Sequence, residues 1–121
     1  MVKRTGPTNV NLRKLIHNLR KVGKKNEAKL WIYVSELLYK PTRQRIEVNI
    51  GKIDKLSKEG DIVLVPGKVL GYGKLTKRVK ISAWKFSEIA LEKIKNANSE
   101  AISIEELLRQ NPKGSNIKII I

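Results

Sequence analysis

The chain has 121 residues, 40% of them hydrophobic, and its 26 Lys and Arg against 11 Asp and Glu give a net charge of +15. It has no cysteine, which excludes disulfides, thiolate metal sites and a cysteine nucleophile, and no apolar run approaches the ~20 residues that a membrane span needs. A length of this order predicts one domain, the lack of a signal-peptide core makes the cytoplasm the expected location, and the excess of cations makes nucleic acid the leading partner class.

The positive charge is concentrated in the first third of the chain. Residues 1–45 hold 12 basic and 2 acidic side chains, residues 46–80 hold 8 and 4, and residues 81–121 hold 6 and 5. Residues 1–9 contain almost nothing to bury, so they are predicted to form an extended basic RNA-binding tail rather than a merely frayed terminus. The tail's candidate contacts are Lys3, Arg4 and Thr5. Residues 10–121 are predicted to form a single α/β domain.

A basic amphipathic helix is predicted after the tail, with Asn9 or Asn11 as its cap and Gly23 as its stop. Helical spacing relates its apolar residues, which are Leu12, Leu15, Ile16, Leu19 and Val22. The cations on or beside the opposite face, or just beyond the helix, are the candidate RNA contacts Arg13, Lys14, Arg20, Lys21, Lys24 and Lys25. Such a helix also suits an anionic membrane, but its apolar stripe lacks flanking aromatics, so no membrane contact is expected.

A second helix is predicted from Asn26 to Tyr39, where Pro41 stops it. This helix is apolar on more than one face, which is typical of a central core element or of a helix covered by a partner. The basic loop of residues 40–45 then adds Arg43 and Arg45 to the candidate RNA contacts.

Residues 61–83 are predicted to form two strands joined by a basic loop. The run from Ile62 to Val65 suits a strand buried on both faces, which Pro66-Gly67 would end. From Leu75 onward apolar and polar residues alternate, as in a half-buried return strand. The loop holds two glycines, Gly71 and Gly73, which let a backbone approach phosphates closely. The candidate phosphate contacts around it are Lys68, Lys74, Lys77 and Arg78.

Shorter elements flank this stretch. Residues 46–50 alternate as a strand, and residues 51–56 have the spacing of one helical turn. Ser87 is expected to cap a helix, and Ser103 with Glu106 forms a capping box that starts another. The apolar face of the Ser87 helix is expected to comprise Ile89, Ala90, Ile94 and Ala97. A helix stop at Asn111-Pro112, a short extended piece at 101–102 and a terminal strand at 116–121 complete the pattern. The fold class is therefore α/β, with an irregular strand-strand-helix core preceded by two N-terminal helices and a basic extended tail.

The sequence lacks the patterns that enzymes of common classes need. Gly67 and Gly73 have five residues between them, and Lys74 is followed by Leu75, so the phosphate-loop spacing and its hydroxyl are both missing. His17 is the only histidine, which cannot by itself supply a usual zinc site or a catalytic triad. No catalytic residue, cofactor, metal or small-molecule substrate is expected. With one aromatic in the loop, a phosphate-and-shape contact with structured RNA is favoured over a stacking platform.

Several blocks of this sequence, in this order, resemble one ribosomal-protein family. They are Lys3-Arg4-Thr5-Gly6-Pro7-Thr8-Asn9, Glu47-Val48-Asn49, Val65-Pro66-Gly67-Lys68-Val69-Leu70-Gly71, Phe86-Ser87 with Ala90, Glu100-Ala101-Ile102-Ser103-Ile104-Glu105-Glu106-Leu107, and Asn111-Pro112-Lys113-Gly114-Ser115. The family is that of the archaeal and eukaryotic large-subunit ribosomal protein L-eighteen-e, a relative of bacterial ribosomal protein L-fifteen. Two positions depart from its pattern: Val10 stands where proline is expected and Ser99 where glycine is expected.

The resemblance implies a structural constituent of the large ribosomal subunit, with its basic N-terminal arm buried in large-subunit rRNA and no catalysis or cofactor. It also implies contacts with neighbouring large-subunit ribosomal proteins, for which the second helix is the candidate surface. The alternative is a free-standing protein that coats RNA or DNA.

Overall fold

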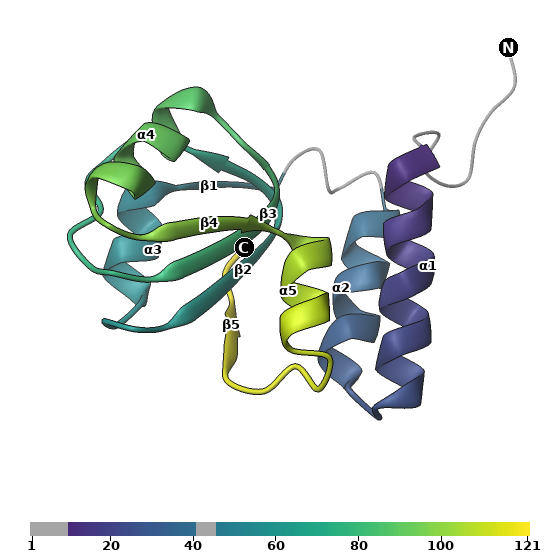
Figure 1. Ribbon diagram of the computed structural model, residues 1–121. Helices are drawn as coiled ribbons and strands as arrows, with labels where there is room; N and C mark the ends of the chain where they lie inside the picture. Colours follow the sequence, from purple (N-terminus) through teal and green to yellow (C-terminus); the bar gives the residue numbers. More distant parts are fainter. Residues whose placement is uncertain (1–9, 41–45) are drawn as a thin grey trace, which may run out of the picture.

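The computed structural model describes residues 10–40 and 46–121, and it is a mixed α/β fold, as the sequence predicts (Figure 1). The predicted tail (1–9) and most of the predicted basic loop (41–45) lie outside the described residues. In chain order the elements are α1 (Val10–Lys25), α2 (Lys29–Tyr39), β1 (Glu47–Asn49), α3 (Ile50–Leu56), β2 (Ile62–Leu70), β3 (Lys80–Phe86), α4 (Glu88–Asn96), β4 (Glu100–Ser103), α5 (Ile104–Gln110) and β5 (Ile117–Ile119).

All the strand pairs described run parallel, and β2 is the centre of the sheet. The strand order is β1-β2-β3-β4, with β5 also on β2. The short strands β1 and β5 pair with different parts of β2, through the registers Glu47↔Lys68 and Ile62↔Ile117. The predicted terminal strand is therefore paired, as its apolar residues require. Helices α3, α4 and α5 each connect two strands, so the core is mostly strand-helix-strand.

Helices cover both faces of the sheet. Leu64 of β2 faces a core built with α1, α2 and α5, whereas Val63 and Val65 face a second core built with α3 and α4. This alternation follows from the two-residue period of a strand. In Figure 1, α2 and α5 lie between the sheet and α1, while α3 and α4 lie on the other side. Helix α1 is thus the outermost element of its side.

The prediction that Pro66-Gly67 ends the buried strand is wrong, because β2 continues to Leu70. The register with β3 shifts between Val65 and Lys68, so the missing amide hydrogen of Pro66 falls at an irregularity in the ladder. Gly67 is needed there because a Cβ atom would stand 2.3 Å from the carbonyl oxygen of Ile46. The pair marks a bulge rather than an end.

The predicted return strand also differs, since β3 begins at Lys80 rather than Leu75 and runs parallel to β2. Because the two strands are parallel, residues 71–79 have to lead from the end of β2 back to the opposite edge of the sheet, where β3 begins. They do so without forming a helix. The alternation from Leu75 is still seen in burial, because Leu75 and Val79 both pack against the α3–α4 core. Their backbone is held by side chains instead of a ladder, as described below.

The helix caps at Ser87 and Ser103 are confirmed: each Oγ accepts a hydrogen bond of 3.1 Å, from the amides of Ala90 and Glu106 respectively. Gly23, by contrast, does not stop the first helix. It is buried within α1, and a Cβ atom there would lie 2.8 Å from Ile32, so glycine lets α1 and α2 approach closely.

The second and fourth helices also differ from prediction. Helix α2 starts at Lys29, later than the predicted Asn26. On α4, Ala90 and Ile94 are buried as expected, but Ile89 is 60% exposed and does not belong to the core face.

Candidate nucleic-acid interface

The solvent-facing side of α1 is a cationic surface. The helix holds six cations and no acidic residue. Its apolar residues Leu12, Leu15, Ile16 and Leu19 are buried, and the predicted cations are all exposed: Arg13, Lys14, Arg20, Lys21, Lys24 and Lys25. With 3.6 residues per turn, this spacing places the cations opposite the apolar stripe. Because α1 is the outermost helix, its charges face solvent along a rod of about 24 Å.

His17 lies in the middle of this cationic surface, although it was not among the predicted RNA contacts. It is exposed, and with Arg13, Lys14 and Asn18 it lines a hollow on the surface of α1. The sequence spacing alone could have placed His17 here, since Arg13 and Lys14 precede it by four and three residues and so lie on the same face of the helix. An imidazole and an amide at this place can donate hydrogen bonds to phosphate or ribose between the cations.

Arg20 has a partner on the next helix. Its guanidinium carbon lies 5.5 Å from the centre of the Tyr39 ring, which is cation–π distance. This contact directs Arg20 toward the α1–α2 junction.

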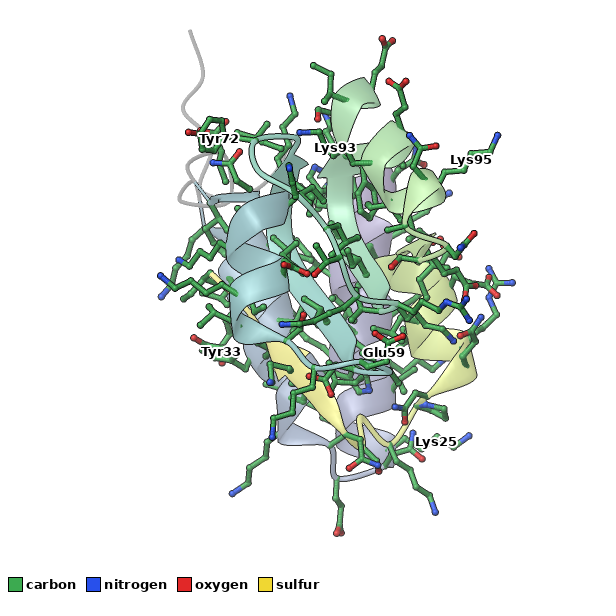
Figure 2. All side chains as sticks on the ribbon, turned by 90° about the vertical axis from the view of Figure 1, so that its left-hand side faces the viewer. Lys25, Tyr33, Glu59, Tyr72, Lys93 and Lys95 are labelled. Carbon is green, nitrogen blue, oxygen red and sulfur yellow. The ribbon has the colours of Figure 1, made fainter. Side chains whose placement is uncertain are left out.

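Helix α2 is in part a core element, because Trp31, Val34 and Leu38 are fully buried. The rest of the helix is not fully covered, since Tyr33 and Tyr39, which lie about 120° apart around the helix axis, are 45% and 37% exposed. Figure 2 shows Tyr33 at the margin of the molecule. The sequence left open whether this helix is central or partner-covered, and the structure gives it a buried face and two exposed tyrosines outside that face.

The predicted cations Lys74, Lys77 and Arg78 do not join the α1 surface. The segment 71–79 is fastened to α3 and α4, the helices on the side of the sheet away from α1. Lys68, Lys74 and Arg78 are exposed. The structure therefore places the described candidate cations in at least two separate regions.

Lys77 is engaged inside the protein. Its ammonium donates to the backbone carbonyls of Asp54 and Ser57, the latter at 2.8 Å, and so binds the C-terminal end of α3. That position suits a cation, because the carbonyls at a helix C-terminus lack intrahelical partners. The structure gives Lys77 a structural role, and its RNA contact stays a prediction.

The negatively charged side chain of Asp54 also holds the segment 71–79 in place. Its carboxylate accepts from the amide and the hydroxyl of Thr76, both at 2.9 Å. Partial burial by itself would raise the pKa of the Asp54 carboxyl, but these hydrogen bonds and the charge of Lys77 hold that pKa below its ordinary value. The carboxylate is therefore a structural anchor.

Ser99, one of the two departures from the family pattern, also holds this segment. Its hydroxyl donates to the carbonyl of Lys77 at 2.8 Å and accepts from the amide of Val79 at 3.0 Å. The other departure, Val10, is the first residue of α1.

Two common types of site are not seen in the described ranges. In residues 10–40 and 46–121, no helix is long and apolar enough to cross a membrane. The same residues contain no group of three or more His, Asp or Glu side chains that could hold a metal ion.

The protein is of the α/β class: it has a parallel sheet and, on its outer side, a helix that carries six cations and no acidic residue. A family model that covers ribosomal proteins of the 50S and 60S subunits, with 50S-L15 and 50S-L18e among them, matches residues 9–102. The chain belongs to this family, as its sequence predicts.

Curated relatives agree with the family model. The chain is 51% identical over 121 residues to the large ribosomal subunit protein eL18 of Methanopyrus kandleri, with 96% of this chain and 95% of the relative covered. It is 46% identical over 117 residues to the protein of that name from Pyrobaculum aerophilum, with 97% and 96% covered. For the one from Archaeoglobus fulgidus the identity is 48% over 114 residues, with 94% and 97% covered.

Proposed function

We propose that this protein is a structural constituent of the large ribosomal subunit that binds folded rRNA through phosphate and shape contacts, without catalysis. Family membership and the names of the relatives support the ribosomal role. The observation that carries the rRNA contact is the surface of α1, where six cations and no carboxylate face solvent on the outermost helix. Phosphate contacts of this kind supply most sequence-independent affinity for nucleic acid.

Other parts of the chain make further contacts with RNA and with a neighbouring protein in this proposal. Lys3, Arg4 and Thr5 of the tail, together with Arg43 and Arg45, are further contacts in this proposal, and they lie outside the described residues. Lys68, Lys74 and Arg78 make a secondary contact elsewhere on the particle. The exposed Tyr33 of α2 marks the surface for a neighbouring ribosomal protein, because aromatic residues are enriched at such interfaces.

Salt dependence tests the α1 surface directly. In a variant with Lys14, Lys21 and Lys24 changed to Gln, binding to refolded large-subunit rRNA should weaken, and the slope of log K against log salt should fall by about 2–3. A matched control changes three exposed lysines elsewhere to Gln, namely Lys55, Lys95 and Lys113. Equal slopes for the two triple variants would refute α1 as the main phosphate contact.

Two further experiments address the tail and the alternative function. Deleting residues 1–9 should weaken RNA binding while leaving the melting temperature unchanged, and loss of folding would show that the tail belongs to the core. A subunit constituent should also stay with the large subunit through a high-salt wash, whereas a free-standing coating protein should dissociate. Release by the wash would favour the coating protein.

A further inference from the structure

The loop Gly71-Tyr72-Gly73, which follows β2, presents an aromatic ring to solvent. Tyr72 has 82% of its surface exposed, whereas the other large hydrophobic residues in the described part of the chain reach 60% at most. Figure 2 shows Tyr72 at the edge of the molecule, at the same end as Lys93. The ring therefore contributes little to the core, and its presence needs another explanation.

Three elements hold the backbone beneath this ring. The amide of Tyr72 donates to Oδ1 of Asn49 at 3.3 Å, and its carbonyl accepts from the amide of Gly51 at 2.9 Å. The ammonium of Lys93, on α4, donates to the carbonyls of Gly71 and Gly73, each at 2.6 Å. The end of β1, the first turn of α3 and the middle of α4 thus fix the backbone while leaving the side chain outside.

The glycines on both sides of Tyr72 are required by close packing. A Cβ atom at Gly71 would lie 2.4 Å from Ile89 Cγ2. Gly73 has a φ of +95°, and a Cβ atom there would lie 2.6 Å from the Cα atom of Gly51. Such a loop binds a ligand with little loss of entropy, because its backbone is already ordered and a tyrosine has only two side-chain torsions to fix.

The surroundings of the ring favour a polyanion. Residues 66–80 contain five cations and no acidic side chain. Next to the loop lies an open hollow of about 240 Å³, lined in part by the exposed Lys74, by Asn96 and by Thr76, whose hydroxyl is already bonded to Asp54. Of the two cations in this lining, Lys93 is bonded to the carbonyls of Gly71 and Gly73, and Lys74 is the exposed one.

We propose that the ring of Tyr72 stacks on one unpaired base of the bound RNA, with Lys74 on a neighbouring phosphate. This rests on the proposed function, since it requires that the protein bind RNA. Bases that are splayed out of loops and bulges stack on tyrosine in this way. A single ring is too little for a platform along a strand, which the sequence argued against, but it is sufficient for one nucleotide.

The test compares full-length Tyr72→Leu and Tyr72→Phe for binding to protein-free, refolded archaeal large-subunit rRNA. Tyr72→Leu should lose roughly 5- to 150-fold in affinity, the range for removal of one stacked base, whereas Tyr72→Phe should retain it. The salt slope should stay that of the wild type, because no phosphate contact is removed. Tyr33→Leu, at an exposed tyrosine of α2, is the matched control and should leave RNA affinity unchanged.

Two further measurements separate the outcomes. Ultraviolet crosslinking should join RNA to the peptide that contains Tyr72, and melting temperatures should show that Tyr72→Leu is folded. If Tyr72→Leu binds RNA as the wild type does, with a steep salt slope, base stacking is refuted while the proposed function stands. If it binds RNA normally but fails to join reconstituted subunits, the ring contacts a protein and the base proposal is equally refuted. A wild-type protein with no salt-dependent RNA binding would overturn the proposed function itself.

Discussion

Replacing Lys93 with Met tests whether one ammonium group holds residues 71–73 in place. Lys93 donates to the carbonyls of Gly71 and Gly73, about twenty positions earlier in the chain, and both distances are 2.6 Å. Methionine keeps a similar length and helix propensity but cannot donate. The variant therefore removes the two hydrogen bonds with little change in side-chain volume.

The expected loss follows from the number and kind of these bonds. A hydrogen bond to a charged group contributes about 1.5–3 kcal/mol when buried. Lys93 is only partly buried, so water can solvate the freed carbonyls and recover part of that energy. We therefore expect the free energy of unfolding to fall by about 1–3 kcal/mol, which is a shift of several degrees in melting temperature for a domain of this size.

Lys95 is the matched control, because it lies on the same helix and points outward into solvent (Figure 2). Urea unfolding should show that Lys93→Met is destabilised and that Lys95→Met is unchanged within about 0.5 kcal/mol. Hydrogen exchange should be faster at the amides of Gly51 and Tyr72 in Lys93→Met only, since both bonds depend on the position of the loop. Equal stability and equal exchange in the two variants would refute the structural role of Lys93.

Three more substitutions test particular contacts. Gly67→Ala should lower the free energy of unfolding by about 2–4 kcal/mol, because the new Cβ atom would stand 2.3 Å from the carbonyl oxygen of Ile46 and push β1 off β2. A variant with the stability of the wild type would contradict this geometry. Ser82→Ala should increase the free energy of unfolding by about 1 kcal/mol and so raise the melting temperature, because the buried Ser82 hydroxyl finds no hydrogen-bond partner in the described part of the chain. A clear loss of stability would show that the hydroxyl does have a partner. Asp54 has a lowered pKa in the folded state, so its contribution is present above its unfolded pKa of about 3.9 and is lost as pH falls through the folded value. Asp54→Asn should therefore destabilise the protein at pH 7, and the gap to the wild type should narrow below about pH 4; a gap independent of pH would exclude the carboxylate's charge as its cause.

The sequence predicted the features that depend on neighbours within one or two turns. The cationic and apolar faces of α1 follow from residue spacing, and the caps at Ser87 and Ser103 follow from the identity of one residue and its distance to an amide three positions later. The same kind of pattern predicted that the chain is α/β and that it ends in a strand, which the structure shows to be paired with β2. The family was also predicted correctly, because its blocks occur in order along the chain.

The tertiary structure decided which of these groups remain available. Lys74 and Lys77 look alike in the sequence, but the ammonium of Lys77 lies on carbonyls of α3 while Lys74 stays exposed. Pro66-Gly67 has the composition of a strand end, yet β1 approaches so closely that the pair serves as a bulge within β2. Each of these outcomes depends on contacts between residues about twenty positions apart, which no local pattern encodes.

By itself, then, the sequence determined the fold class, the helix boundaries set by capping serines, and a charge balance that favours an anionic partner. Only the folded chain showed that β2 and β3 are parallel, that residues 71–79 cross the sheet without a helix, and that Lys93 holds Tyr72 in place. The physical reason is that periodicity, capping and charge are local or additive properties. The partner of a particular lysine or glycine, in contrast, is decided by how the helices pack on the sheet.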